Sequence, residues 1–222
     1  MNELFPIFLK LDRLNTLVVG GGNVALEKAS ALLRNSPGAS LTLVAPMFRE
    51  DTLVYLKDFP QVILCERGFE FSDLEGRDLV ICATDNRELH VGIKEACAER
   101  HLLCNVADTP DLCDFYLGSI VQKGDLKIAI STNGKSPTLA KRIRAFLEDV
   151  IPEEIQEGLE GMEAVRKTLK GDFQEKIRVL NELTKGVIFR KNHALEQPLS
   201  RFGDCFQRPL MADSAPLVNH SG

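Results

Sequence analysis

Short apolar runs alternate with helical patterns over the first hundred residues of the chain. The apolar runs predict five strands, at 15–19, 41–45, 62–65, 78–83 and 102–106. Apolar residues that recur every three or four positions predict helices between most of them, at 23–34, 48–59 and 86–100. Apolar strands separated by helices are typical of a parallel sheet covered on both faces. The sequence therefore predicts an α/β fold for a first domain at 1–112.

The pattern changes after this domain. Apolar and polar residues alternate on both sides of a Lys-Gly-Asp turn at 123–125, which predicts a β-hairpin over 115–131. Ser136 can cap a helix over 137–150, whose first residue is a proline. A hairpin and one helix cannot bury their apolar faces alone. We therefore expect the segment 113–150 to pack on the first domain, on a second copy of the chain, or on both.

The remainder of the chain divides into a helical part and a tail. Two amphipathic patterns, one from Ile155 to Leu169 and one from Phe173 to Leu183, predict a small helical domain at 151–189. Beyond it the periodicity is lost, and we expect residues 190–222 to form a mobile tail.

Charge and apolar content narrow the class of protein. The 222 residues include 27 basic and 32 acidic side chains, a net charge of −5, which disfavours general binding to nucleic acid. No apolar run reaches the roughly 18 residues that span a bilayer. The N-terminus has no basic stretch before a long apolar one, as a signal peptide would. These features predict a cytoplasmic protein without a membrane partner.

Cysteine and histidine spacing gives little sign of a metal site. The six cysteines include no Cys-x-x-Cys pair, and we expect small buried thiols. Cys97, His101 and Cys104 are the best metal-like grouping, but they lack a fourth ligand at any usual spacing. We predict no metal site, and we expect His90 and His101 on helix surfaces.

A glycine-rich turn supplies the first functional signal. The run Gly-Gly-Gly-Asn-Val-Ala at 20–25 follows an apolar strand and opens a helix. In that context Gly20 permits a tight turn, and Gly22 lets the backbone approach a pyrophosphate at the helix N-terminus, next to Asn23 and Val24. The alternative is a glycine turn that binds nothing.

The second predicted strand lacks the acid that usually holds the adenosine ribose of NAD. Pro46 and Met47 follow this strand, and Arg49 comes before Glu50. Backbone groups near Pro46 and Met47 would then hold the adenosine end, and the residues alone do not exclude NADP.

Two carboxylates follow the fourth and fifth predicted strands. Asp85 comes directly after Thr84, and Asp108 lies two residues past the fifth strand. Ligands of open parallel sheets bind at these carboxyl ends, and an ionised aspartate there can accept a proton. The alternatives are that Asp85 caps the following helix and that Asp108 belongs to a turn. Asp111 and Asp114 are expected to be solvated.

The charge is locally inverted between 123 and 144, where basic residues outnumber the single acid Asp125. They are Lys123, Lys127, Lys135, Lys141, Arg142 and Arg144. In an acidic chain this predicts a site for a polyanionic small molecule, although a solvated helix face would give the same pattern.

Taken together, these segments resemble the precorrin-2 dehydrogenase family, which includes the N-terminal part of siroheme synthase. The resemblance covers about the first 150 residues. The matching segments are 5–8 (FPIF), 18–25 (VVGGGNVA), 83–85 (ATD), 104–108 (CNVAD) and 130–137 (ISTNGKSP).

The resemblance implies a Rossmann-like fold and NAD-dependent oxidation of precorrin-2 to sirohydrochlorin, with ferrous iron insertion as a second activity in some members. It also implies a homodimer formed through the hairpin and helix. Asp108 matches the family's catalytic aspartate. The implied cofactor contacts are Gly20, Gly22, Asn23, Val24, Pro46, Met47, Thr84 and Asp85. The implied contacts to the tetrapyrrole are Thr132, Asn133, Lys135, Ser136 and Lys141.

Two other functions remain open at this point. A non-catalytic NAD-sensing regulatory module would keep the glycine turn and the dimer, but would need no acid near the nicotinamide. A dehydrogenase for a small acid would need fewer basic residues than the segment after 123 contains.

Overall fold

The computed structural model describes residues 2–169 and 173–184 of the chain. They fall into two compact units, one ending at Gln156 and the other beginning at Glu157. The predicted tail at 190–222 lies outside the described residues, and the predicted boundaries at 112 and 150 stay predictions.

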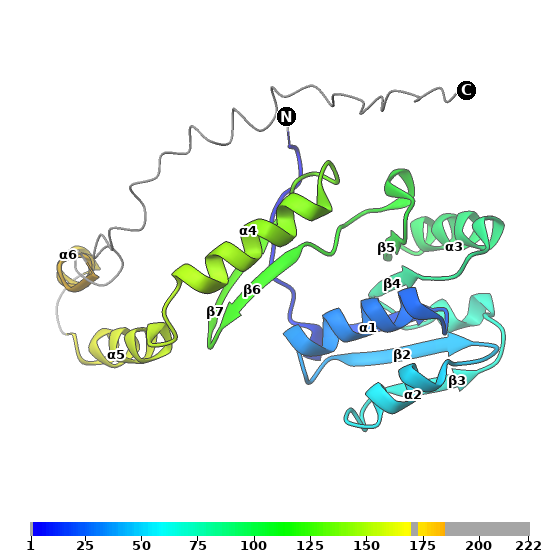
Figure 1. Ribbon diagram of the computed structural model, residues 1–222, viewed down its shortest axis with the longest axis horizontal. Helices are drawn as coiled ribbons and strands as arrows, with labels where there is room; N and C mark the ends of the chain where they lie inside the picture. The colour runs from blue at the N-terminus through cyan, green and yellow to red at the C-terminus, as the bar shows by residue number, and fades with distance from the viewer. Residues whose placement is uncertain (1, 170–172, 185–222) are drawn as a thin grey trace, which may run out of the picture. The chain divides into compact units, whose positions relative to one another are not determined.

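The first unit contains a five-stranded parallel sheet (Figure 1). Its strands are β1 (Asn15–Val19), β2 (Ser40–Ala45), β3 (Ile63–Glu66), β4 (Leu79–Cys82) and β5 (Leu103–Val106). The order across the sheet is β3-β2-β1-β4-β5, so the winding direction reverses between β1 and β4. Ligands of such sheets bind at this reversal, beyond the carboxyl ends of the strands. The predicted α/β, Rossmann-like class is confirmed.

Helices cover both faces of this sheet. They are α1 (Asn23–Asn35), α2 (Glu50–Leu56) and α3 (Arg87–Glu99), with short 3₁₀ turns η1 (Leu11–Arg13), η2 (Phe71–Leu74) and η3 (Pro110–Leu112). Side chains alternate between the faces because the side-chain period of a strand is two. Val18 and Ile81 pack in the cluster that contains α1 and α2, whereas Leu17 and Val80 pack in the cluster that contains α3.

The outer edge at β3 is less buried than an apolar strand suggests. Ile63 is 58% exposed and Leu64 is 39% exposed, whereas β5 at the opposite edge of the sheet is largely buried. The adjacent helix α2 spans Glu50–Leu56 and is shorter than the predicted 48–59. Its Leu56 side chain is buried in the core, whereas its Leu53 side chain is 38% exposed.

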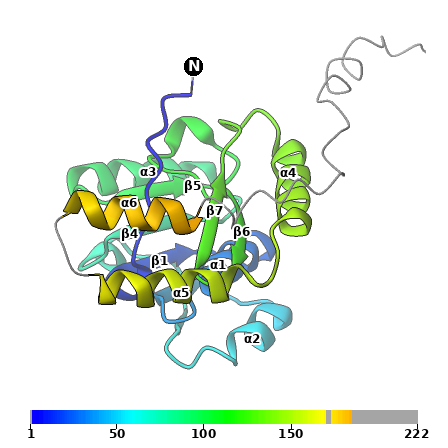
Figure 2. The same cartoon turned by 90° about the vertical axis from the view of Figure 1, so that its left-hand side faces the viewer.

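An antiparallel hairpin and a helix follow the sheet. The hairpin consists of β6 (Ser119–Lys123) and β7 (Leu126–Ile130), and α4 (Pro137–Val150) lies along it (Figure 2). Ser136 caps α4 as predicted, with its hydroxyl accepting a hydrogen bond of 3.1 Å from the Leu139 N–H. The apolar stripe of α4 stays largely open, since Phe146 is 52% and Val150 47% exposed.

Two helices follow at the predicted places, α5 (Ile155–Thr168) and α6 (Phe173–Thr184). Over residues 2–169 and 173–184, every helix falls short of the length and apolarity that a membrane crossing requires.

Three of the cysteines form a buried cluster between the sheet and α3. The Cys82, Cys97 and Cys104 side chains are fully buried, as small core thiols were predicted to be, whereas Cys65 and Cys113 are only half-buried. Hydrogen bonding to Cys82, together with burial, raises the pKa of Cys104 to about 12, so the thiol stays protonated and unreactive at neutral pH. In the described part of the chain, no group of three His, Cys, Asp or Glu side chains could hold a metal ion.

A buried carboxylate joins the segments between β3 and β4. Asp73 accepts hydrogen bonds from the Arg67 guanidinium and from the Glu70 N–H. The hydrogen bond from Arg67 lowers the pKa of Asp73 below its ordinary value, although burial opposes the shift. The interaction therefore stabilises the fold at neutral pH, and that contribution is lost as the pH falls through the lowered pKa.

Replacing Asp73 by asparagine is expected to lower the free energy of unfolding at pH 7 by about 1 kcal/mol, because a charged hydrogen bond becomes a neutral one. Urea unfolding at pH 7 and at pH 3 measures this difference. It should shrink at pH 3, which lies below the ordinary aspartate pKa, because folding there must deprotonate a carboxyl that is protonated in the unfolded chain. The exposed Asp58→Asn variant is the control. A difference that grows at pH 3 would contradict the assignment.

Candidate active site

The candidate cofactor residues lie at one edge of the sheet, because the strands before them end in register. Val19 pairs with Val44 on one side and with Cys82 on the other, and Cys82 pairs with Val106. The residues that follow each strand therefore share the edge at which the winding direction reverses. They are Gly20, Gly22, Asn23 and Val24 after β1, Pro46 and Met47 after β2, Thr84 and Asp85 after β4, and Asp108 after β5.

The glycine turn is tightly enclosed at its start and open at its end. A Cβ on Gly20, whose φ is 136°, would lie 2.4 Å from the Ala83 carbonyl oxygen. A Cβ on Gly21 would lie 2.2 Å from the Met47 carbonyl oxygen, whereas one on Gly22 would have nothing within 4 Å. Sequence reasoning assigned roles to Gly20 and Gly22 only. The enclosed position Gly21 was missed because the motif leaves its middle residue unspecified.

The open end of this turn fits an anionic ligand. Gly22 is the N-cap of α1 and offers no side chain to the first N–H groups of the helix, and Asn23 beyond it is exposed. Free N–H groups at a helix N-terminus, next to space without protein atoms, suit a pyrophosphate. The geometry therefore fits a dinucleotide, with the backbone of Asn23 and Val24 as its contact.

The adenosine side of the site is formed by the residues after β2. Pro46 is exposed and Met47 is 74% exposed, while Phe48 is buried and anchors the turn in the core. The Arg49 N–H donates a hydrogen bond of 3.2 Å to the Gly21 carbonyl, which joins this turn to the glycine turn.

Thr84 has a buried histidine as its partner. The Thr84 Oγ1 and His90 Nε2 atoms are 2.8 Å apart, and Thr84 Oγ1 also accepts a hydrogen bond from the Asn86 N–H. Burial lowers the pKa of His90, with the Asp85 charge opposing the shift, so the imidazole is neutral at pH 7. The expectation of a surface histidine was wrong for His90, which is 5% exposed.

Asp85 does not cap the helix that follows it. The Asn86 side chain accepts the hydrogen bond from the Leu89 N–H, at 3.0 Å, and so caps α3. The Asp85 side chain is exposed at the edge of the site. The capping alternative for Asp85 is therefore excluded.

Asp108 lies in a turn whose backbone favours few residue types. Its φ is 55°, in the left-handed region that aspartate and asparagine tolerate better than most side chains. The carboxylate is exposed and has no hydrogen-bond or ion-pair partner among the described residues. An exposed, unpaired carboxylate at the end of β5 is available to accept a proton from a ligand.

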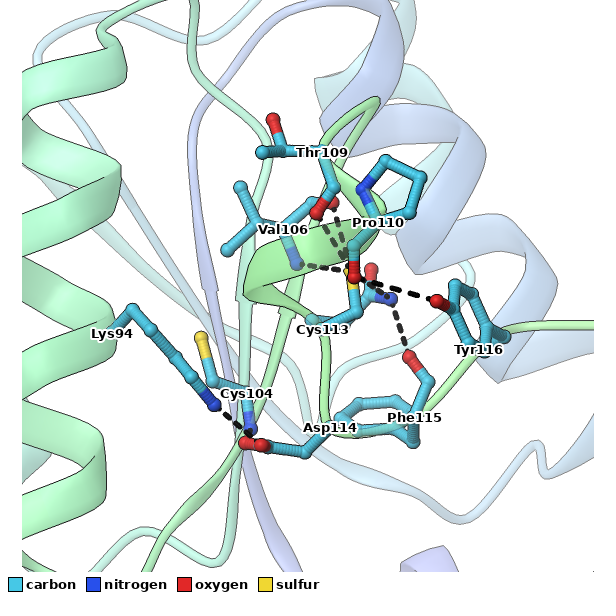
Figure 3. A network of polar contacts seen from close by, with 10 residues as sticks. Lys94, Cys104, Val106, Thr109, Pro110, Cys113, Asp114, Phe115 and Tyr116 are labelled. Carbon is cyan, nitrogen blue, oxygen red and sulfur yellow. Dashed lines mark hydrogen bonds and ion pairs between the residues drawn. The ribbon is translucent and has the colours of Figure 1, made fainter. Parts of the chain in front are cut away.

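The segment after Asp108 is fixed to β5 by a network of polar contacts (Figure 3). The Asp114 carboxylate accepts a hydrogen bond of 2.9 Å from the Cys104 N–H and forms an ion pair with Lys94. The Cys113 thiol contacts the N–H and the carbonyl of Val106, at 3.3 and 3.2 Å. Asp114 is exposed, as expected, but its carboxylate also holds the turn in place, a role that the sequence did not indicate.

The candidate tetrapyrrole residues lie in the loop from β7 to α4 and in the first turns of α4. Ser119 pairs with Ile130, so this loop leaves the hairpin beside the segment that connects it to the Asp108 turn. Thr132 Oγ1 accepts a hydrogen bond of 3.2 Å from the Ser136 N–H, and Asn133 has a φ of 53°.

The six basic residues between 123 and 144 divide into two groups. Lys123 pairs with Glu153, Lys127 donates to the Asn35 carbonyl, and Arg144 pairs with Glu148. The other three are exposed and have no ion-pair partner in the described part of the chain: Lys135, Lys141 and Arg142. Only this second group is free to bind an external anion.

Comparison with known proteins agrees with this geometry. Residues 7–119 match a family described as putative NAD(P)-binding, and residues 123–149 match one described as sirohaem biosynthesis protein central. The first match covers the sheet and its edge, and the second covers β7 and all but the last residue of α4.

Similar curated proteins are longer than this chain. A siroheme synthase of Pseudoalteromonas atlantica is 40% identical over 171 residues, which are 77% of this chain and 36% of that protein. A siroheme synthase of Thioalkalivibrio sulfidiphilus is 41% identical over 150 residues, 68% of this chain and 30% of that protein. The chain thus spans about a third of the length of these relatives.

A solved structure shares the fold. A chain named SirC, precorrin-2 dehydrogenase, superposes with a TM-score of 0.66 at 24% identity, covering 82% of this chain and 90% of that one. The likeness extends over the sheet and the elements that follow it.

Proposed function

We propose a function from one premise: the chain belongs to the putative NAD(P)-binding family, and its next segment matches the sirohaem biosynthesis protein central family. On that premise it is an NAD-dependent oxidoreductase that converts precorrin-2 to sirohydrochlorin. The observation that supports this most is the unpaired Asp108 carboxylate at the sheet edge, where the glycine turn offers a dinucleotide site.

The chain's own residues would bind, orient and deprotonate the substrate. When bound, NAD⁺ accepts a hydride at its nicotinamide ring. The glycine turn would hold the pyrophosphate, and Thr84, fixed by His90, would border the nicotinamide half. The oxidation removes a hydride and a proton, and the Asp108 carboxylate would take the proton. The network around Asp114 would keep that carboxylate at the end of β5.

The unpaired cations suit a tetrapyrrole with eight carboxylates. Lys135 and Lys141, two of the predicted contacts, are exposed, and Arg142 adds a third free charge. Thr132 and Ser136 are engaged in the turn before α4, so they would shape the site as well as contact the ligand. One or two carboxylates would not need this many cations, which disfavours a dehydrogenase for a small acid.

The exposed stripe of α4 supports the predicted homodimer. Phe146 and Val150 stay about half exposed, and apolar side chains at a helical spacing favour burial against a second copy. Sedimentation at micromolar concentration is expected to give a dimer. A monomer would contradict this part of the proposal.

Incubation of the purified chain with NAD⁺ and precorrin-2 tests the function. The expected result is one NADH, detected by its absorbance, for each sirohydrochlorin formed. A non-catalytic NAD-sensing module would bind NAD⁺ without turnover, and that result would overturn the proposal.

Iron insertion is proposed as a second activity at the same edge, with ferrous iron as a substrate and Asp108 accepting pyrrole N–H protons. Sirohydrochlorin and ferrous iron, supplied without NAD⁺, should give siroheme faster than the uncatalysed control. If siroheme forms no faster than in the uncatalysed control, the proposal of iron insertion is overturned, while the proposed oxidation of precorrin-2 is unaffected.

A further inference from the structure

We propose that Asp51 makes this chain prefer NAD over NADP by occupying Arg49, the cation that follows β2. The inference rests on the proposed dinucleotide site. It concerns the adenosine ribose, whose 2′ position bears a hydroxyl in NAD and a phosphate in NADP.

Arg49 lies where a 2′-phosphate would be read. In this type of sheet the pyrophosphate lies at the N-terminus of the helix after β1, and the adenosine ribose lies over the end of β2. The Arg49 N–H donates to the Gly21 carbonyl, so the backbone of Arg49 is joined directly to the pyrophosphate turn. A free arginine near this position is the usual means of accommodating the 2′-phosphate.

The Arg49 guanidinium is not free in this structure. Its Nε lies 3.1 Å from Asp51 Oδ1 and its Nη2 lies 3.0 Å from Asp51 Oδ2, a bidentate pair. Asp51 Oδ1 also accepts a hydrogen bond of 2.9 Å from the N–H of Thr52, whose side chain is fully buried. The carboxylate is thereby held toward Arg49 and uses the donors that a phosphate would need.

The charge around this pair also opposes a phosphate. Arg49, Glu50, Asp51 and Val54 line a shallow hollow beyond β2, and their formal charges sum to −1. Both members of the pair are about half exposed, and an exposed ion pair contributes at most about 1 kcal/mol. The preference for NAD therefore depends on the negative charge of Glu50 as well as on the occupied Arg49 guanidinium. We expect this preference to be moderate in size. The uncharged 2′-hydroxyl of NAD meets no such repulsion.

Calorimetric titration with NAD⁺ and NADP⁺ tests the inference. Asp51→Asn is expected to strengthen NADP⁺ binding about three- to tenfold and to change NAD⁺ affinity less than twofold. The matched control is Asp58→Asn, which removes the same charge from an exposed position just past α2. A control that gains NADP⁺ affinity equally would overturn the inference, because net charge alone would then explain the effect.

Arg49→Gln variants separate the two members of the pair. In the wild-type background this change removes no free donor but leaves Asp51 without its cation, so NADP⁺ affinity should fall only modestly, by less than about threefold. In the Asp51→Asn background it should abolish the gain. A single Arg49→Gln variant that loses NADP⁺ affinity tenfold would show that Arg49 was available all along, and would overturn the inference.

The outcomes also separate this inference from the proposed function. A wild-type chain that oxidises precorrin-2 with NAD⁺, while Asp51→Asn leaves NADP⁺ affinity unchanged, overturns the inference alone. A wild-type chain that binds neither dinucleotide overturns both. Titration with adenosine 2′,5′-bisphosphate against ADP provides the same comparison without the nicotinamide half.

Discussion

Replacing Asp108 by asparagine is expected to lower the turnover of precorrin-2 about a hundred- to ten-thousandfold, the usual contribution of a general base. Asparagine removes the proton acceptor but tolerates the left-handed backbone at this position, where φ is 55°. Alanine should give the same loss of turnover, with an added cost in stability from its less favourable backbone. NAD⁺ affinity should change little, because the proposed pyrophosphate contact lies after β1 and not after β5.

Asp85→Ala is the matched control for this prediction. Asp85 is an exposed carboxylate at the end of the neighbouring strand, and it does not cap α3. It should therefore cost less activity than Asp108→Asn and little stability. NADH production and thermal melting of both variants give the comparison.

Two results would contradict the assignment of Asp108. If Asp85→Ala loses activity and Asp108→Asn keeps it, the base lies after β4. If both variants keep most of their activity, the enzyme works without a protein base, by orienting the tetrapyrrole and the nicotinamide alone.

The main elements of the fold were predictable because they depend on local patterns. Each of the five strands was identified by its apolar run, and α4 was predicted at 137–150 from its cap and its first-position proline. The open edge at β3 was not predictable in the same way. An apolar run does not reveal how far other segments cover a strand: β3 and β5 both lie at an edge of the sheet, yet only β3 is exposed.

The site was predicted at the level of strand ends but not of side-chain partners. Asp85 and Asp108 were singled out by their places after apolar strands, and Thr84 by the family resemblance. The burial of His90 and the contacts of Asp114 were missed because their partners are far from any motif: His90 meets Thr84 across the start of α3, and Asp114 meets Cys104 ten residues earlier. A polar side chain is buried where a tertiary contact satisfies it, and a single sequence does not display that contact.

Gly22→Asp is expected to weaken NAD⁺ binding at least tenfold, about 1.4 kcal/mol, while leaving the fold intact. A Cβ at Gly22 meets nothing within 4 Å, and its φ of −90° suits any residue, so the aspartate fits without strain. Its side chain would enter the space before α1 and place a negative charge where the pyrophosphate is proposed to bind. An aspartate is also a good N-cap, so it would compete for the same N–H groups.

Gly21→Ala, unlike Gly22→Asp, is expected to strain the backbone. Its Cβ would lie 2.2 Å from the Met47 carbonyl oxygen and 2.8 Å from the Ala45 Cβ, so the backbone at the end of β2 must shift. Gly21→Ala should therefore lower the melting temperature as well as NAD⁺ affinity, whereas Gly22→Asp should lower affinity alone. Calorimetry and thermal melting on both variants distinguish these outcomes. An unchanged NAD⁺ affinity in folded Gly22→Asp would mean that the turn after β1 is a structural element and that the dinucleotide, if bound, lies elsewhere.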